Sequence, residues 1–232
     1  MKIFLRSFLA IGCLILIVSC SSDEEIGKEE VPLKFIRTID NKSGYTEKWI
    51  YNDKNNVVKI VSSNDKTSTF EYDNNGELVK ADTYFTSEPN LKSEEFRLEY
   101  LPGKIIVNVK KYFSGKNITE RKEHILDNKG RPTKSIESDG FKKIYTLSNG
   151  NVSSVFYANK NDVGSVIGEY LYDDKRNLYS NYPIGFRLIR GDEFINENNV
   201  IWSKNYNYQE SINNEYDKDG YLTKDHRYYY TY

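Results

Sequence analysis

The chain has 232 residues, of which 33 are basic and 34 acidic, so its formal net charge is −1. This balance leaves no excess positive charge for a nucleic-acid surface, and we expect no nucleic-acid partner. The 20 Tyr, 11 Phe and 2 Trp favour strands, and the scarcity of Ala disfavours long helices. Both cysteines, Cys13 and Cys20, lie close to the start of the sequence, so we expect the rest of the chain to be stabilised without disulfides.

Residues 1–19 are predicted to be a signal peptide. A basic start is followed by an apolar run over residues 8–18, which is shorter than the roughly 20 residues that a membrane-spanning helix needs. The segment ends in Ile-Val-Ser-Cys at residues 17–20, which resembles a bacterial lipoprotein lipobox. The resemblance implies cleavage before Cys20 and a thioether-linked lipid on that residue, which would make the membrane a partner of the chain.

Residues 20–30 are expected to be a lipidated, acidic tether that leads into a folded domain over residues 31–232. The start of this tether resembles the export signal of Bacteroidota surface lipoproteins, and its residues are Ser21, Ser22, Asp23, Glu24 and Glu25. The resemblance implies an outer-membrane lipoprotein that is exposed at the cell surface. A solvated linker, with the domain facing the periplasm, is the alternative, because tethers are commonly acidic too.

A repeat of about eight copies runs through the domain. Its clearest copies, at residues 72–80 and 216–224, share Tyr, Asp, Gly, Leu and Lys at equal spacing. The Asp side chain can bond to nearby backbone N–H groups and Gly can take a positive φ, so each copy predicts a hairpin turn. We therefore expect positive φ at Gly76, Gly130 and Gly220. The copies start at residues 51, 72, 100, 126, 147, 172, 195 and 216.

Apolar and polar residues alternate before these turns, as over residues 96–100, which indicates strands with one buried face. Looser turns between the copies imply two strands for each copy. The predicted fold is all-β, a long antiparallel meander of repeated hairpins that is curled into a barrel-like or open rolled sheet. Residues 87–95 are the one place where we allow a helical turn.

The copies resemble the YD repeat of the Rhs family, in which a Tyr-Asp pair is followed by Gly and Leu. The pair stands here at residues 72–73, 172–173 and 216–217, with Gly76 and Gly220 after the first and third. Rhs proteins build large β-shells from many such hairpins, and this chain has few copies and no toxin cargo domain. The chain is also similar to small Bacteroidota lipoproteins described as porin-like-fold domains of unknown function, which implies a curled antiparallel sheet and no known activity.

Three of the turns, at residues 73–76, 127–130 and 217–220, are similar to the start of a calcium-binding loop. Calcium takes about six to eight oxygen ligands, and an EF-hand loop supplies a bidentate Glu that all three segments lack. A turn in which the Asp side chain bonds to backbone N–H groups explains both Asp and Gly. We therefore interpret these segments as structural turns and expect neither a bound metal nor another cofactor.

His124 and His226 are interpreted as half-buried strand residues, because a zinc site needs three or four ligands and no cysteine remains in the domain. The sequence contains no nucleophile elbow, phosphate-binding loop or His-Glu-x-x-His motif. Its Asp and Glu residues fall mostly in turns and at outward strand positions rather than in a recognisable catalytic pair. We therefore expect no catalytic residues and no enzymatic activity.

The Tyr-rich segment at residues 228–232 has three interpretations. We favour a closing strand whose alternate tyrosines pack on the core, and the second interpretation is an aromatic platform for sugar or peptide. The third, the last strand of an outer-membrane barrel, is disfavoured because the strands carry Lys and Glu on their outer face. The expected function is a non-catalytic, lipid-anchored binding module of the envelope or cell surface, with a glycan, peptide or protein ligand. The alternative is a structural or assembly subunit of an outer-membrane complex. Exposed aromatics on a concave face would favour binding, and an exposed sheet edge would favour assembly.

Overall fold

The computed structural model describes residues 33–232 except 114 and 207, and antiparallel strands make up more than half of them. The predicted all-β fold is therefore confirmed. The strands are β1 (Thr38–Asn41), β2 (Thr46–Tyr51), β3 (Val57–Ser62), β4 (Lys66–Tyr72), β5 (Leu78–Phe85), β6 (Lys92–Leu101), β7 (Lys104–Phe113), β8 (Lys116–Leu126), β9 (Pro132–Glu137), β10 (Lys142–Ser148), β11 (Asn151–Ala158), β12 (Gly164–Arg176), β13 (Asn198–Asn205), β14 (Tyr208–Ser211), β15 (Glu215–Tyr216), β16 (Leu222–Lys224) and β17 (Tyr228–Thr231).

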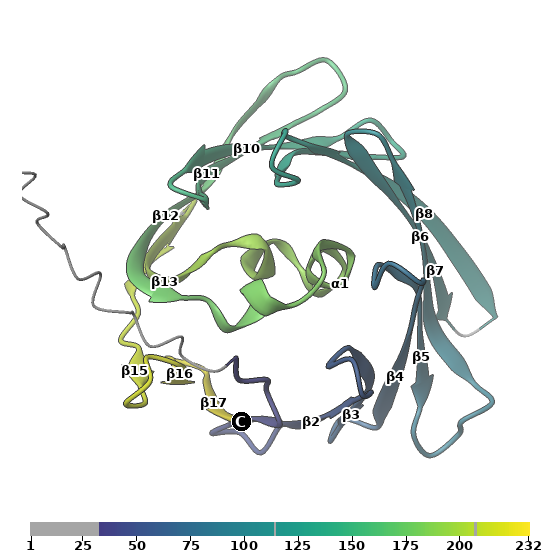
Figure 1. The fold of residues 1–232 in the computed structure, drawn as a ribbon. Helices are drawn as coiled ribbons and strands as arrows, with labels where there is room; N and C mark the ends of the chain where they lie inside the picture. The colour runs from purple at the N-terminus through teal and green to yellow at the C-terminus, as the bar shows by residue number, and fades with distance from the viewer. Residues whose placement is uncertain (1–32, 114, 207) are drawn as a thin grey trace, which may run out of the picture. The chain divides into compact units, whose positions relative to one another are not determined.

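These strands form one antiparallel meander, in which neighbours in the sequence are neighbours in the sheet except for β14 and β15. The last strand returns to the first, because β1 pairs with β17 as well as with β2. The sheet is not closed: β14 pairs with β13 and β15 with β16, which leaves a seam between β14 and β15. Of the two predicted forms, the structure is the open rolled sheet, curled around its interior (Figure 1).

The repeat turns have the conformation that their sequence requires. Oδ1 of Asp73 accepts hydrogen bonds of 2.9 Å from the backbone N–H groups of Asn75 and Glu77, and the φ of Gly76 is +83°. In the turn these two backbone N–H groups have no partner on a neighbouring strand, and the Asp side chain supplies their acceptor instead. Equivalent turns have φ of +76° at Gly130, +81° at Gly220 and, where Asn takes the place of Gly, +60° at Asn55.

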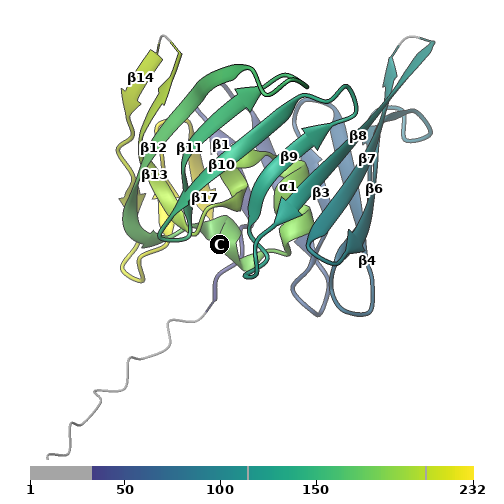
Figure 2. The same ribbon diagram turned by 90° about the horizontal axis from the view of Figure 1, so that it is seen from above.

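Successive turns of a meander lie at opposite ends of the sheet. We call one end the closed end; it holds the repeat turns at residues 52–56, 73–77, 127–131 and 217–221. We call the other the mouth end; it holds the turns at residues 41–45, 63–65, 159–163 and 225–227 (Figure 2). The chain enters the sheet at the closed end, where Nζ of Lys34 lies 2.7 Å from carboxylate oxygens of both Asp217 and Asp219.

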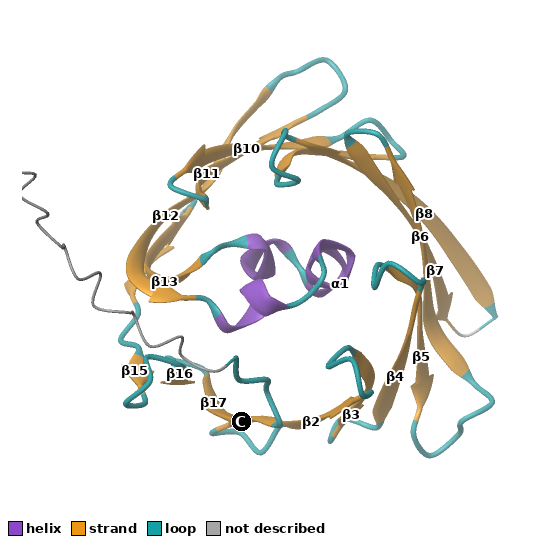
Figure 3. Cartoon of the chain, in the orientation of Figure 1, coloured by secondary structure: helices purple, strands orange, loops and turns teal. Residues whose placement is uncertain are grey.

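A helical segment between β12 and β13 leaves the wall and fills part of the interior (Figures 1 and 3). We call this segment the insert, and it contains η1 (Leu178–Asn181), α1 (Ile184–Arg190) and η2 (Asp192–Ile195). Asn177 starts η1 by accepting a 2.8 Å hydrogen bond from the N–H of Tyr179, and Gly191, whose φ is +130°, follows the last residue of α1 as its C-cap. No helix of the described residues is both long and apolar enough to cross a membrane.

The insert corrects the expected position of helical structure. The sequence predicts a possible helical turn within residues 87–95. In the structure β6 begins at Lys92, and Glu94 and Glu95 pair in register with both β5 and β7. Two neighbouring strands thus satisfy the backbone of residues 92–95 in the extended conformation. Residues 86–91 form the turn between β5 and β6, in which the N–H of Leu91 donates to the carbonyl oxygen of Glu88 at 2.8 Å. The helices lie instead in the insert, where the chain has left the sheet and its backbone has no neighbouring strand to pair with.

The insert and the wall share a packed core. Phe186 of α1 has no exposed surface, and its ring centroid lies 5.1 Å from that of Phe70 and 5.7 Å from that of Trp49. Burying a side chain of this size stabilises the fold by about 1.5–3 kcal/mol. Gly185 permits the close approach of α1 to β6, since a Cβ on Gly185 would clash with the hydroxyl of Tyr100. The insert is therefore a fixed part of the interior.

Candidate functional site

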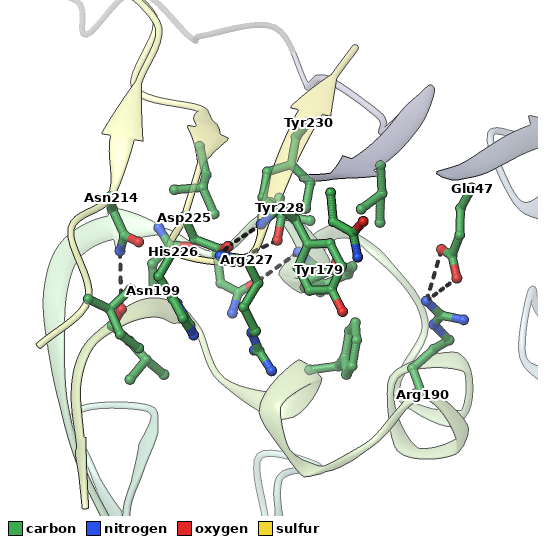
Figure 4. Close-up of a pocket in the computed structure, with 18 of the residues that line it drawn as sticks. Glu47, Tyr179, Arg190, Asn199, Asn214, Asp225, His226, Arg227, Tyr228 and Tyr230 are labelled. Carbon is green, nitrogen blue, oxygen red and sulfur yellow. Dashed lines mark hydrogen bonds and ion pairs between the residues drawn. The ribbon is translucent and has the colours of Figure 1, made fainter. Parts of the chain in front are cut away.

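A cavity of about 600 Å³ lies between the insert and the wall (Figure 4). Its sides come from the insert, from β1, β2, β13, β16 and β17, and from the segment between β14 and β15. The exposed residues Asn64, His226 and Arg227 of two mouth-end turns also line it, so the cavity reaches solvent at the mouth end. Its size falls within the roughly 300–1,000 Å³ of small-molecule sites. We refer to it as the main cavity.

The lining of the main cavity mixes aromatic rings, amides, charges and aliphatic side chains. Amides offer donors and acceptors together, and Tyr offers an apolar face with a polar tip, so the lining can hold a polar ligand that also has apolar surfaces. The aromatic residues are Tyr45, Tyr179, Phe194, Tyr228 and Tyr230; the amides are Asn41, Asn64, Asn177, Asn199 and Asn214; the ionisable residues are Glu47, Arg190, Asp225, His226 and Arg227.

Glu47 on β2 is 4% exposed and is held by donors of the protein itself. Nη2 of Arg190 donates to its two carboxylate oxygens at 3.2 and 3.0 Å, Nε1 of Trp49 donates at 2.9 Å, and the hydroxyl of Tyr45 donates at 2.6 Å. Burial and the bond to Glu47 raise the pKa of Tyr45 to about 12, which keeps its hydroxyl a donor. Burial is the largest influence on Arg190 and alone would lower its pKa, but the charge of Glu47 and its hydrogen bond, together with Tyr179 and Tyr45, outweigh burial and raise the pKa. The pair is thus charged and internally compensated.

Asp225 organises the turn that carries the exposed rim of the main cavity. Its Oδ1 accepts hydrogen bonds of 2.7 Å from the backbone N–H groups of Arg227 and Tyr228, and its Oδ2 accepts one of 2.8 Å from the hydroxyl of Tyr230. Tyr228 therefore starts β17 with its side chain lining the cavity, whereas the next residue, Tyr229, is 39% exposed. This alternation is what a strand requires.

His226 lies in this turn and not in a strand, so the strand part of its interpretation is wrong. The side chain of Asp225 bonds to the backbone locally, which favours a turn over continued strand pairing. The side chain of His226 is half-buried as expected, with 27% exposed, and its Nε2 lies 3.7 Å from Oε2 of Glu210 on β14, on the other side of the seam. His226 and Arg227 also line an adjacent cavity of about 340 Å³, so the two cavities meet at the seam.

His124 lies on β8 as expected, but it is buried rather than half-buried, with 6% of its surface exposed. It lines a cavity of about 290 Å³ to which Leu188 and Ile189 of α1 also contribute. Charged and apolar side chains line the rest of this cavity, among them Lys111, whose Nζ lies 2.9 Å from Oε1 of Glu120. We find no role for His124 in the main cavity, to whose lining it does not belong.

The other residues predicted from the sequence lie away from the main cavity or outside the described part of the chain. The signal peptide at residues 1–19, Cys20 and the export-signal residues 21–25 lie outside the described residues. Gly76, Gly130 and Gly220 lie in closed-end turns and do not line the main cavity. The turn at residues 217–220, compared above with a calcium loop, holds the amine of Lys34 between its carboxylates. No group of three His, Cys, Asp or Glu side chains suited to a metal ion occurs within the described ranges.

Sequence reasoning missed the contribution of the insert to the main cavity, which consists of Asn177, Leu178, Tyr179, Arg190 and Phe194. Two signals could have indicated it. The repeat copy that starts at Tyr172 has Arg176 where the clearest copies have Gly, and Pro183 and Gly191 bracket a short apolar stretch. The copy assigned to Ile195 is not a hairpin either, because this residue ends η2.

No protein-family model and no curated protein matches this chain. Two similar solved structures are porin-like proteins from Bacteroides. The protein from Bacteroides vulgatus ATCC 8482 is 11% identical with a TM-score of 0.42, over 86% of this chain and 99% of that one. The protein from Bacteroides uniformis ATCC 8492 is 11% identical with a TM-score of 0.40, over 86% and 98%. At these scores the likeness carries no argument about function.

Proposed function

We propose that this protein is a non-catalytic binding module of the bacterial cell envelope, held to a membrane by a lipid on Cys20, with its ligand site in the main cavity. The observation that carries the proposal is the cavity itself: about 600 Å³, lined by amides and aromatic rings and reaching solvent at the mouth end. The insert is packed against the wall through Phe186, so the space exists before a ligand arrives. A preformed site binds without the entropic cost of ordering the protein.

The carboxylates of the main cavity support binding rather than catalysis. A general base or nucleophile needs an oxygen directed at the substrate. Both oxygens of Glu47 accept hydrogen bonds from the protein, and so do both oxygens of Asp225. These groups therefore stabilise the walls of the cavity.

The course of the chain supports an orientation for the anchored protein. The chain joins the sheet at the closed end through Lys34. Lys34 lies 14 positions after Cys20, and this length of chain can span at most about 50 Å. A lipid on Cys20 would hold the closed end nearer the membrane and direct the mouth of the cavity away from it. Exposure at the cell surface follows if residues 21–25 act as an export signal; a domain that faces the periplasm is the alternative.

A structural or assembly role is the second candidate, and the seam favours it. β14 pairs with β13 alone among the described pairings, so its other edge is free for a strand of a partner protein. Tyr206 and Tyr208 beside this edge are 68% and 60% exposed. In this case the ligand would be another envelope protein.

Chemical-shift mapping by NMR separates the two candidates. The protein is the mature chain with Cys20→Ser, and it is mixed with pools of glycans and of short peptides. Binding in the main cavity predicts shifts at the amides of Asn64, Arg227 and Tyr228 and a loss of binding in Arg227→Ala. Arg121→Ala is the control, because Arg121 is an exposed arginine of β8 that does not line the cavity. Shifts confined to β14 would contradict the cavity site and favour the assembly role.

A further inference from the structure

We infer that the ligand of the main cavity is an uncharged carbohydrate, a short neutral oligosaccharide. The inference rests on the proposed binding function and adds the chemical class of the ligand. It begins with charge. Glu47 is compensated by Arg190, and Asp225 is satisfied by two backbone N–H groups and a hydroxyl. A charged group placed beside these two residues would lose its hydration and gain no counter-ion. The remaining ionisable residues of the lining, His226 and Arg227, lie in the exposed turn at the mouth end, where water and salt screen a charge.

The amides of the main cavity suit hydroxyl groups. Nδ2 of Asn214 donates to the carbonyl oxygen of Val200 at 3.1 Å, and Nδ2 of Asn199 donates to that of Lys175 at 3.3 Å. These bonds fix which way each amide faces, and each side-chain oxygen retains the capacity to accept. Asn64, at the exposed rim, can offer both donor and acceptor. A sugar hydroxyl donates and accepts at once, so it can use both kinds of group.

The aromatic rings of the main cavity suit the apolar face of a sugar ring. Tyr179 is held against Phe194, with ring centroids 4.2 Å apart in an edge-to-face arrangement, so it loses little freedom when a ligand binds. Tyr228 lines the cavity from β17. Figure 4 shows these tyrosines in the same cavity as Asn199 and Asn214. The faces of a pyranose ring carry C–H groups and its edge carries hydroxyls, which matches rings and amides in one site.

A peptide fits this cavity less well than a sugar does. Extended peptides bind by adding main-chain hydrogen bonds to a sheet edge, with side chains in alternate pockets. The polar groups of the main cavity are side-chain amides inside the curled sheet. The strands that carry two of them, β1 with Asn41 and β13 with Asn199, are each paired on both sides. Peptide binding is therefore an outcome that the experiment must detect and not the outcome we expect.

The test is isothermal titration calorimetry on the mature chain with Cys20→Ser. The probes are maltotetraose, cellotetraose, xylotetraose and mannotetraose as neutral sugars, tetragalacturonate as an anionic sugar, and tetra-alanine as a peptide. We expect at least one neutral sugar to bind, with a Kd that changes less than about twofold between about 0.05 and 0.5 M NaCl, because salt screens only charged ligands. Tyr228→Ala should weaken binding at least about tenfold.

Tyr229→Ala is the matched control, since Tyr229 is the neighbouring residue on the outer face of the same strand and should leave the Kd unchanged. Asn64→Ala, in an exposed turn, should weaken binding about two- to tenfold, as the loss of one hydrogen bond does, and guards against misfolding of Tyr228→Ala. Binding of tetragalacturonate or tetra-alanine alone, with dependence on Tyr228, overturns the inference and leaves the proposed function standing. If the protein binds none of the probes at about millimolar concentration, the inference is also overturned. If the glycan and peptide pools then cause no chemical-shift changes either, the proposed binding function is wrong as well.

Discussion

Arg190, the last residue of α1, donates hydrogen bonds to both carboxylate oxygens of Glu47 on β2, at 3.2 and 3.0 Å. The two residues are 143 positions apart in the sequence, and their pair joins the insert to the wall. The guanidinium also lies 5.5 Å from the ring centroid of Trp49 and 5.4 Å from that of Phe194. One ion pair thus fixes the position of the insert and one side of the main cavity.

Glu47→Ala should lower the free energy of unfolding by about 3–5 kcal/mol, because it leaves the guanidinium of Arg190 in the interior without its partner. Glu47→Gln should cost less, since the amide oxygen still accepts a hydrogen bond. The control is Glu71→Ala, which removes an exposed partner of Lys80 and should cost about 0–1 kcal/mol. Urea unfolding measures all three variants. If Glu47→Ala and Glu71→Ala lowered the free energy of unfolding by the same amount, the buried pair would not fix the insert.

Gly76→Ala should lower the free energy of unfolding by about 1–2 kcal/mol, through strain of the backbone alone. The φ of Gly76 is +83°, and a Cβ at this position would meet no atom within 4 Å, so crowding contributes nothing. Gly76→Asn should cost less, because Asn tolerates this conformation and Asn55 already adopts φ of +60° in the equivalent turn. Thermal unfolding distinguishes the variants. If Gly76→Ala melted at the temperature of the parent, the strain argument would fail.

Acid should destabilise the protein in part through Asp127. The side chain of Arg131, and then the backbone N–H groups of Arg131 and Lys129, hold the pKa of Asp127 at about 2, below its usual 3.8. A pKa that is lower in the folded state means that the ionised carboxylate stabilises the fold above about pH 4 and that this contribution is lost as the pH falls toward 2. Asp127→Asn removes the titration and keeps the acceptor oxygen, as Asn52 does in the β2–β3 turn.

The measurement is the free energy of unfolding at a series of pH values between about 2 and 5. The parent should be more stable than Asp127→Asn at the upper end, and the difference should shrink as the pH falls. Arg131→Met is the control, because it removes the first cause of the lowered pKa and should reduce the same pH dependence. A difference between parent and Asp127→Asn that stays constant over the whole range would contradict the role given to Asp127.

The sequence predicted the strands and turns because their causes are local. The bonds that Asp73 makes reach only two and four residues along the chain, and alternation along a strand shows which face is buried. The repeat therefore predicted the all-β meander. It could not predict whether the sheet closes, because the seam between β14 and β15 depends on how far seventeen strands curl.

The sequence singled out the tyrosines of β17 that line the main cavity, but the inward position of the insert could not be predicted, for a physical reason. The main cavity depends on the insert, whose position is decided by long-range contacts such as Phe186 with Phe70 and Arg190 with Glu47. No local sequence pattern predicts that a short helix will lie inside the curled sheet rather than on its surface. His226 shows the same limit on a smaller scale, since it stands in a Tyr-rich segment that alternates like a strand, and one Asp side chain makes it a turn residue.

The orientation of the anchored protein predicts a difference between two single cysteines. With Cys13 removed and Cys20 lipidated, a new cysteine supplies the sole thiol. Val163→Cys places it at the mouth end, where Val163 is 67% exposed, and Lys218→Cys places it in a closed-end turn, where the Lys218 side chain is 91% exposed. A fluorophore at residue 218 should transfer energy to acceptor lipids in vesicles more efficiently than one at residue 163. Equal transfer would contradict the orientation, and a lack of vesicle binding would contradict the anchor instead.

Cys20→Ala tests the anchor itself. If residues 17–20 are a lipobox, the variant should appear as an uncleaved precursor or as a soluble periplasmic protein, because the lipid is then missing and no described helix can cross a membrane. Fractionation after a carbonate wash measures this, with the parent expected in the membrane pellet. As a matched control, Asp23, Glu24 and Glu25 are replaced together by Ala, which should keep membrane attachment and reduce digestion by external protease if the export signal operates. A Cys20→Ala protein that stays in the washed pellet would overturn the lipid anchor, whereas unchanged protease exposure of the alanine variant would overturn only the export signal.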